Sequence, residues 1–274
     1  NKYIGKECFE QSAQISQEKP VATLIIVNRV ETARKIYDLL HKEKQKAING
    51  HKSKIKEDAN IELVIGSMRP LDRDEQAERL QKVVGSERPD ETQQTSFVVS
   101  TQCLEVGANY DFDAIISECA SFDALRQRFG RLNRSGRNIE AQGIVLINEN
   151  HIKAEKDIKN DKPIDPIYGN AMTRTWNWLI EQSSKDESSE ENTIDFGIDN
   201  INSILQDLAK KDQSIINLLA PSALLNAPVL LPAYLNSLCQ TFPRSLPDLD
   251  IAKFLHGSQR ANTDVQIVWR NDFV

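Results

Sequence analysis

Arginine side chains are concentrated in residues 126–137, where Arg128, Arg131 and Arg134 stand three residues apart. On a helix this spacing would place the three side chains along one side. Guanidinium groups are suited to forked contacts with phosphate oxygens, and Gly130 would let the backbone approach a phosphate closely. Positive charge held beside a transferring γ-phosphoryl group stabilises its transition state. The spacing therefore indicates a segment suited to phosphate binding and phosphoryl transfer.

These residue types would also serve purely structural roles, which the sequence alone leaves open. Arginines on a solvated helix commonly form exposed salt bridges, and Asp123 and Glu118 are nearby in the sequence. Residues 42–56 carry six lysines and would either contact nucleic-acid phosphates or form a solvated loop, which the negative net charge favours. Trp176 and Trp178 would either stack on bases or fill a core, and their place on a predicted helix favours the core.

The composition excludes several classes of protein. The chain has 274 residues with 34 basic and 40 acidic side chains, a net charge of −6, so it is no strongly cationic nucleic-acid coat. No stretch has the roughly 18 apolar residues of a membrane span, so we expect no membrane partner. The spacing of cysteines and histidines resembles no metal site, which predicts reduced thiols, a cytoplasmic protein and no metal ligands here. These residues are Cys8, Cys103, Cys119, Cys239, His41, His51, His151 and His256.

Predicted strands and helices alternate before and around the arginine-rich segment. Residues 21–28 form a continuous apolar run, which is typical of a strand buried on both faces of a parallel sheet. Alternation of this kind predicts an α/β fold whose functional sites lie at the carboxyl ends of the strands. The pattern predicts further strands at residues 61–66, 97–100, 114–119 and 143–147, and helices at residues 33–40, 73–84 and 122–132.

The second part of the chain predicts a separate, mainly helical domain. Residues 151–165 are rich in Lys, Asp and Pro and predict a linker, and residues 183–192 predict an acidic, serine-rich loop. The predicted domains are therefore a lead-in at residues 1–20, an α/β domain at 21–150, the linker, and a helical domain at 166–274. Within the last of these, we predict helices at residues 171–182, 201–208, 215–219 and 231–238, and a strand at residues 265–269.

Two stretches carry patterns that resemble superfamily 2 helicases. Residues 127–134, Gln-Arg-Phe-Gly-Arg-Leu-Asn-Arg, resemble helicase motif VI, and residues 100–113 resemble motif V through Ser100, Thr101, Gln102, Glu105, Gly107 and Asp111-Phe112-Asp113. This combination is similar to the CRISPR-associated helicase-nuclease of type I interference systems. Upstream, residues 23–28 resemble motif IV, and residues 66–69 with Arg73 are similar to motif IVa. A weaker similarity, to the tail of the type I-G branch, covers residues 254–257 and 265–270.

The resemblance implies a RecA-like parallel sheet with flanking helices, the second of two helicase lobes, and ATP as cofactor. Arg131 and Arg134 match the residues that reach the β and γ phosphates, and Arg134 is favoured as the arginine finger. Gln127 would lie near the γ-phosphate or the attacking water. Arg128 would lie at the nucleotide site, where in the family it more often orients the motif by pairing with acidic groups.

The resemblance also implies contacts that couple the nucleotide to DNA. Gly107 and Asn109 would approach the nucleotide ribose or the arginine finger. Asn109 stands where the family usually has Asp, so it keeps an acceptor oxygen and loses a charge. Single-stranded DNA phosphates would be bound through hydroxyl, guanidinium and backbone N–H groups at the strand ends. The residues concerned are Asn28, Ser67, Arg69, Thr101 and Gln102.

Other parts of a helicase motor are expected outside this sequence. We find no G-x-x-x-x-G-K-[ST] phosphate loop, no acidic Mg²⁺-binding helicase motif and no His-Asp pair of an HD nuclease domain. We therefore expect that a first lobe supplies most of the Mg²⁺ contacts and that this chain alone does not hydrolyse ATP. The first lobe and the HD nuclease domain are accordingly expected partners.

The implied function is ATP-dependent translocation 3′ to 5′ on single-stranded DNA, which would unwind target DNA for degradation in CRISPR type I antiviral defence. This would take place in a prokaryotic cytoplasm, after recruitment by an RNA-guided surveillance complex. Two alternatives stay open at this point. One is a non-catalytic adaptor that docks nucleic acid or a partner protein, and the other is a superfamily 2 remodeller of DNA or RNA outside CRISPR systems.

Overall fold

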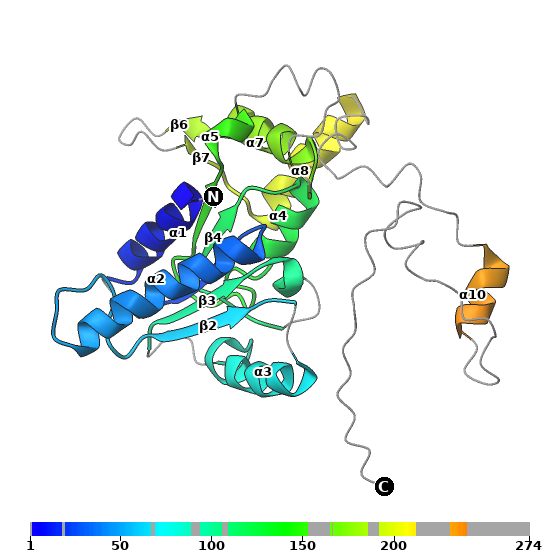
Figure 1. Cartoon of the computed structure of the whole chain (residues 1–274). Coiled ribbons are helices and arrows are strands. Elements are labelled where there is room, and N and C mark those ends of the chain that lie inside the picture. Colours follow the sequence, from blue (N-terminus) through cyan, green and yellow to red (C-terminus); the bar gives the residue numbers. More distant parts are fainter. Residues whose placement is uncertain are drawn as a thin grey trace, which may run out of the picture. The chain divides into compact units, whose positions relative to one another are not determined.

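The computed structural model contains a five-stranded parallel sheet in the order β2-β3-β1-β4-β5 (Figure 1). The strands are β1 (Ala22–Ile26), β2 (Asn60–Val64), β3 (Ser96–Ser100), β4 (Ala114–Glu118) and β5 (Gln142–Leu146). Each predicted strand of the first domain overlaps one of these, and the predicted α/β fold is confirmed. The structure describes residues 2–17, 20–66, 69–88, 94–105, 109–152, 165, 167–185, 192–211 and 231–239.

The central strand β1 is buried on both faces, which explains its unbroken apolar run. In the parallel register, Leu24 lies level with Val98 of β3 and Ile115 of β4. Successive side chains of a strand point to opposite faces, so Leu24 and Ile25 belong to two different core clusters. The sheet therefore needs a covering layer on each side.

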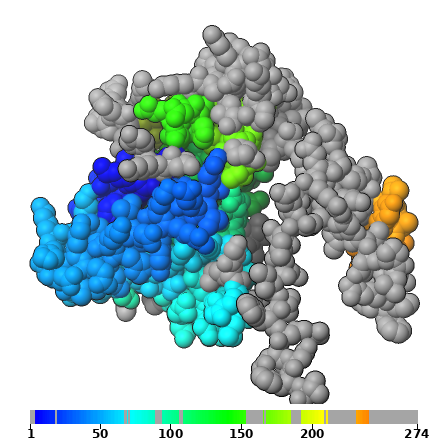
Figure 2. All heavy atoms as spheres, in the orientation of Figure 1, coloured from blue at the N-terminus to red at the C-terminus, as the bar shows by residue number. Residues whose placement is uncertain are grey.

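Three helices supply those two layers. α1 (Lys2–Ile15) and α2 (Val30–Ile48) pack side by side over one face, where both are visible at the surface in Figure 2. α3 (Pro70–Val84) contributes Leu80 and Val84 to the core on the opposite face. The apolar side chains of α1 recur with the spacing of one helical face, so the predicted lead-in contains a helix that packs into the sheet domain. They are Ile4, Cys8, Phe9 and Ala13.

The helix that carries the arginine-rich segment is shorter than its sequence pattern predicts. α4 spans Phe122–Phe129 and not residues 122–132, and Gly130 closes it by donating its N–H to the carbonyl of Arg126 at 2.9 Å. Beyond this point the backbone pairs with residue Phe112, which donates to the carbonyl of Arg131 and accepts from the N–H of Asn133. These non-local hydrogen bonds draw the chain out of the helix, so the predicted single arginine ridge is wrong.

Among the described residues, six elements follow β5 in the chain. They are α5 (Glu149–Ile152), α7 (Ala171–Gln182), β6 (Ser184–Lys185), β7 (Asn192–Thr193), α8 (Ile198–Lys211) and α10 (Pro232–Cys239). The first helices of the predicted helical domain share a core cluster with α4, in which Trp178 is 5% exposed and contacts Phe122 edge to face. The core interpretation of Trp178 is therefore confirmed. By its internal contacts the chain divides into two compact units, residues 1–221 and 222–274.

Some predicted elements fall outside the described residues. These are the helix at 215–219, the strand at 265–269, the tail resemblance at 254–257, most of the predicted linker and most of the acidic loop, which β6 and β7 flank as an antiparallel pair. In the part of the chain that the structure describes, no helix combines the length and apolar character that a membrane crossing requires.

Candidate functional site

The carboxyl ends of β1, β3 and β4 bring motifs IV, V and VI into contact. Asn28 follows β1, Gln102 follows β3 in the short 3-10 helix η1 (Gln102–Leu104), and Glu118 ends β4. The side-chain amide of Gln102 donates to the carbonyl of Asn28 at 3.3 Å, and the backbone N–H of Asn28 donates to a carboxylate oxygen of Glu118 at 2.8 Å. The structure thus brings these residues together at the strand ends, where the sequence predicts a functional site.

Arg128 reaches this point from α4 and is 0% exposed. A guanidinium has five N–H donors, and each of the five has an acceptor within 3.0 Å. The acceptors are Glu105 Oε1 at 2.8 Å, Ser117 Oγ at 3.0 Å, the Glu118 carbonyl at 2.8 Å, Asn28 Oδ1 at 3.0 Å and the Tyr168 hydroxyl at 2.9 Å. Arg128 therefore has no donor left for a nucleotide in this arrangement, and its geometry is that of an organising residue.

The turn at residues 165–169 contributes a residue that sequence reasoning missed. Tyr168 is buried, its hydroxyl accepts from Arg128, and burial raises its pKa while the charge of Arg128 opposes that rise. Asp165 shapes the turn because its Oδ1 accepts the N–H groups of Ile167 and Tyr168, both at 2.8 Å. Gly169 has φ +56°, which favours glycine. An Asp-Pro pair followed by Gly within four residues is the turn signal that the sequence offered.

Glu118 is a second buried charged group at the strand ends, and it is 7% exposed. Burial raises its pKa above the ordinary value, while the N–H of Asn28 and the charge of Arg128 act in the opposite direction. A carboxyl group with a raised pKa in the folded protein stabilises the fold below its unfolded pKa. That contribution is lost as the pH rises through the folded pKa.

Arg131 and Arg134 lie in the turn after α4 and differ in exposure. Arg131 is 8% exposed and donates to the carbonyls of Leu104 at 3.4 Å and Glu105 at 2.9 Å. Its pKa is lowered, first by burial and then by the neighbouring charge of Arg134. Arg134 is exposed. Its Nε and Nη1 donate hydrogen bonds, whereas its Nη2 has no partner among the described residues. The two guanidiniums are therefore neighbours, one facing motif V and one facing outward.

Two residues of motif V form hydrogen bonds with Arg134, one with its backbone and one with its side chain. The backbone N–H of Arg134 donates to Asp111 Oδ1 at 2.7 Å, its Nε donates to Asn109 Oδ1 at 3.1 Å, and its Nη1 donates to the carbonyl of Gly130 at 3.3 Å. Asn109 therefore contacts Arg134 directly, while the role of Arg134 as an arginine finger stays a prediction. The amide oxygen performs the acceptor role that a carboxylate would also perform.

The acidic end of motif V anchors the loop that follows. Arg137 pairs with Asp111 and with Asp113, each at 2.7 Å, and these three side chains are buried. Asp113 also accepts from the backbone N–H of Ala22 at 2.7 Å and from Arg88 at 2.7 Å. This network at the amino ends of β1 and β4 fixes the segment that carries Arg134, because a buried ion pair needs all its partners in place.

The remaining predicted site residues are less closely grouped. Gln127 is exposed on α4, and Thr101 is 5% exposed at the end of β3. Both side-chain groups of Asn28 are engaged inside the protein, since Nδ2 donates to the carbonyl of Cys119 and Oδ1 accepts from Arg128. Arg69 is exposed and forms a two-bond pair with Asp72 at 2.7 Å. Ser67 and Gly107 lie outside the described residues, and DNA contact by this set stays a prediction.

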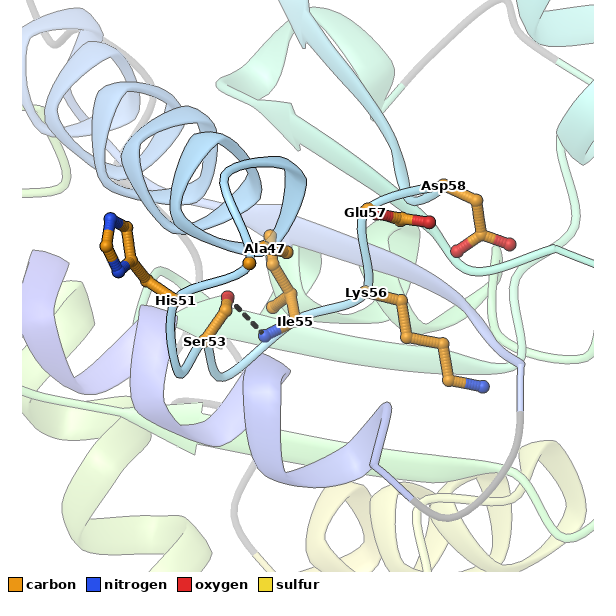
Figure 3. Close-up of a pocket in the computed structure, with 8 residues that line it drawn as sticks. Ala47, His51, Ser53, Ile55, Lys56, Glu57 and Asp58 are labelled. Carbon is orange, nitrogen blue, oxygen red and sulfur yellow. Dashed lines mark hydrogen bonds between the residues drawn. The ribbon is translucent and has the colours of Figure 1, made fainter.

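The lysine-rich stretch lies at the far end of α2 and takes no part in this site. A hollow of about 590 Å³ lies there. Figure 3 shows the residues that line it, among them Ala47, His51, Ser53 and residues 55–58. None of the predicted site residues lines it. The predicted loop begins only after Ile48, because α2 continues through Lys42, Lys44 and Lys46. Three of the six lysines make contacts within the chain: Lys44 with the Ala59 carbonyl, Lys46 with Glu43, and Lys54 with Glu10.

The sheet, the strand-end contacts and the arginine turn carry the residues that resemble helicase motifs IV, V and VI. Residues 19–137 match the family model described as "CRISPR-associated nuclease/helicase Cas3, C-terminal". Over 132 residues, 48% of this chain, the sequence is 31% identical to the CRISPR-associated helicase Cas3 of Thermoproteus tenax and covers 19% of that protein. The resemblance to the C-terminal half of a Cas3-like superfamily 2 helicase is therefore confirmed.

Solved structures support the fold. The chain is similar to T. fusca Cas3 with a TM-score of 0.53 and 20% identity, covering 77% of this chain and 22% of that one. The AMPPNP form of the same protein matches with a TM-score of 0.51 and 18% identity, covering 77% of this chain and 22% of that one. The chain thus spans about a fifth of the length of these relatives.

We expect Arg128→Lys to destabilise the protein strongly. Lysine keeps the charge but offers three donors from one point, so acceptors around the buried site lose their partners. The free energy of unfolding, measured by urea titration, should fall by about 3–5 kcal/mol. Arg126→Lys is the matched control, because Arg126 is exposed on the same helix with one 3.2 Å bond to Asn202. Equal effects of the two changes would contradict the organising role of Arg128.

Glu118→Gln should change how stability depends on pH. Glutamine keeps the acceptor for the N–H of Asn28 and removes the buried charge. Since the folded pKa of Glu118 is raised above 4.5, the unfolding free energy of the unchanged protein relative to this variant should fall as pH rises from 4.5. Urea titrations across that range measure it, with exposed Glu140→Gln as control. A difference that grows with pH would contradict the assignment.

Proposed function

We propose that this chain forms the second motor lobe, with part of an accessory region, of an ATP-dependent DNA helicase of CRISPR type I interference. The observation that carries the proposal is the division among the motif VI arginines. Arg128 is buried, and all of its N–H donors are hydrogen-bonded within the lobe. Arg134 is exposed on a turn that hydrogen bonds from motif V hold in place. A braced guanidinium with unused donors is suited to stabilise charge on a transferring phosphoryl group.

The nucleotide would bind where this lobe faces a first lobe, and Arg134 and Arg131 would reach its phosphates. In support, the T. fusca Cas3 that shares this fold has been solved as ADP and AMPPNP forms. Gln127 lies exposed on the preceding helix, from which it would approach the attacking water. Among the described residues no three acidic, His or Cys side chains gather as metal ligands, and we assign the Mg²⁺ to the first lobe.

Coupling to DNA would run through the strand-end contacts. Gln102 and Asn28 are bonded to each other, and Asn28 is bonded to Arg128, so motifs IV, V and VI form one connected group. We propose that Thr101, Gln102 and Arg69, with Ser67, contact single-stranded DNA phosphates on this side. Asn28 would act indirectly, by holding this group together, because its backbone N–H and its side chain are already engaged within the lobe.

In the complete protein, ATP-driven closure and opening of the lobes would move single-stranded DNA 3′ to 5′ and deliver it to an HD nuclease domain. Recruitment by an RNA-guided surveillance complex in a prokaryotic cytoplasm is part of the same proposal. Its support is the Cas3-like sequence of residues 19–137. A remodeller outside CRISPR systems would use the same motor parts, and the neighbouring genes distinguish the two.

In the complete protein, Arg134→Ala should lower DNA-stimulated ATP turnover by roughly 10³-fold, the scale of a lost arginine finger. Affinity for single-stranded DNA should stay unchanged, since Arg134 lies apart from the proposed strand-end contacts. Arg126→Ala, an exposed arginine on the neighbouring helix, should leave turnover normal.

Near-normal turnover in the Arg134 variant would remove that residue from the proposed role. A complete protein that binds DNA and never hydrolyses ATP would favour the adaptor instead.

A further inference from the structure

The turn after α3 touches both motif V and the segment after motif VI. Gly85 pairs with Tyr110 in an antiparallel bridge, and a Cβ at Gly85 would overlap the carbonyl oxygen of Gln81, so glycine allows this close approach. Ser86 donates its backbone N–H to the carbonyl of Asn109 at 3.3 Å, and its own carbonyl accepts from the hydroxyl of Ser135 at 2.9 Å. The backbone of Ser86 is therefore hydrogen-bonded both to Asn109, which contacts Arg134, and to Ser135, which follows Arg134 in the chain.

The side chain of Ser86 completes a chain of hydrogen bonds that ends on the exposed arginine. Asn109 Nδ2 donates to Ser86 Oγ at 2.6 Å, and Asn109 Oδ1 accepts from Arg134 Nε at 3.1 Å. The two ends of an amide are chemically different, and only the oxygen can accept from a guanidinium. With Ser86 holding the NH₂ end, the oxygen of Asn109 stays directed at Arg134.

An aspartate at position 109 would not need this support. Its two oxygens are both acceptors, so either rotation of the carboxylate presents an oxygen to the guanidinium. An asparagine that rotates by half a turn would instead present a donor to a donor. With Asn at position 109, the rotation of its amide decides whether Arg134 meets an acceptor. Among the described residues, Ser86 accepts the hydrogen bond from the NH₂ end of that amide.

We propose that Ser86 is a positioning residue for Arg134, acting through Asn109 to hold the guanidinium in the orientation that meets the γ-phosphoryl group. This inference rests on the proposed function, which assigns Arg134 to the nucleotide. Ser86 itself touches no substrate. Its hydroxyl sets the amide of Asn109, the amide sets Nε of Arg134, and the backbone of Arg134 is fixed separately by Asp111.

The test measures steady-state ATP turnover of the complete protein with single-stranded DNA. Ser86→Ala should lower kcat about fivefold, the effect of one lost hydrogen bond, with KM for ATP and DNA affinity unchanged. Ser86→Thr keeps the hydroxyl and should retain kcat. Ser135→Ala is the control for the turn itself, because its hydroxyl bonds to the same turn without touching Asn109, and it should retain kcat.

The decisive comparison repeats Ser86→Ala in the Asn109→Asp background, relative to that variant alone. There the loss should shrink to less than about twofold, because a carboxylate needs no fixed orientation. An equal loss in both backgrounds would overturn the proposal, since Ser86 would then act only on the structure of the turn. No loss from Ser86→Ala while Arg134→Ala abolishes turnover would overturn it and leave the proposed function standing. Normal turnover of Arg134→Ala would overturn both.

Discussion

Arg128 carries a positive charge into a place from which solvent is excluded, and the arrangement of the strand ends follows from the need to satisfy it. An unpaired buried charge is strongly destabilising, so its carboxylate partner and four further acceptors must all be present. Those acceptors come from the ends of β1 and β4, from the residues after β3, and from the turn at residues 165–169. One side chain therefore couples motif IV, motif V and the region after the sheet domain.

The same constraint separates the roles of neighbouring arginines that look alike in the sequence. α4 ends at Phe129, which leaves Arg128 on the inner side of the helix and places Arg131 and Arg134 in the turn beyond it. The turn is held by backbone pairing with Phe112 and by the buried ion pairs of Arg137. Rigid support of this kind holds an exposed guanidinium in place, so it would lose little conformational entropy on binding the phosphate that we propose for it.

Local sequence patterns were sufficient for the strands, because an unbroken apolar run such as residues 21–28 is typical of a strand that a parallel sheet buries on both faces. Local patterns were insufficient where hydrogen bonds from residues distant in the sequence determine where a helix ends or which side chains meet. The predicted helix over residues 122–132 fails at Gly130, since the competing hydrogen bonds come from Phe112. Tyr168 and Ser86 were missed for the same reason: their partners, Arg128 and Asn109, lie 40 and 23 residues away. The helix at Lys2–Ile15 could have been predicted from the spacing of its apolar residues. It was missed because it lies outside the segments that resemble helicase motifs.

The central claim is that Arg134 is available to a nucleotide and that Arg128 is not. Modification of arginines by phenylglyoxal in the complete protein, followed by peptide mass spectrometry with and without a non-hydrolysable ATP analogue, tests it directly. We predict that Arg134 is modified without nucleotide and protected with it, whereas Arg128 stays unmodified in both conditions because it is 0% exposed. Modification of Arg128 as fast as that of Arg134, or an Arg134 that saturating analogue fails to protect, would contradict this claim.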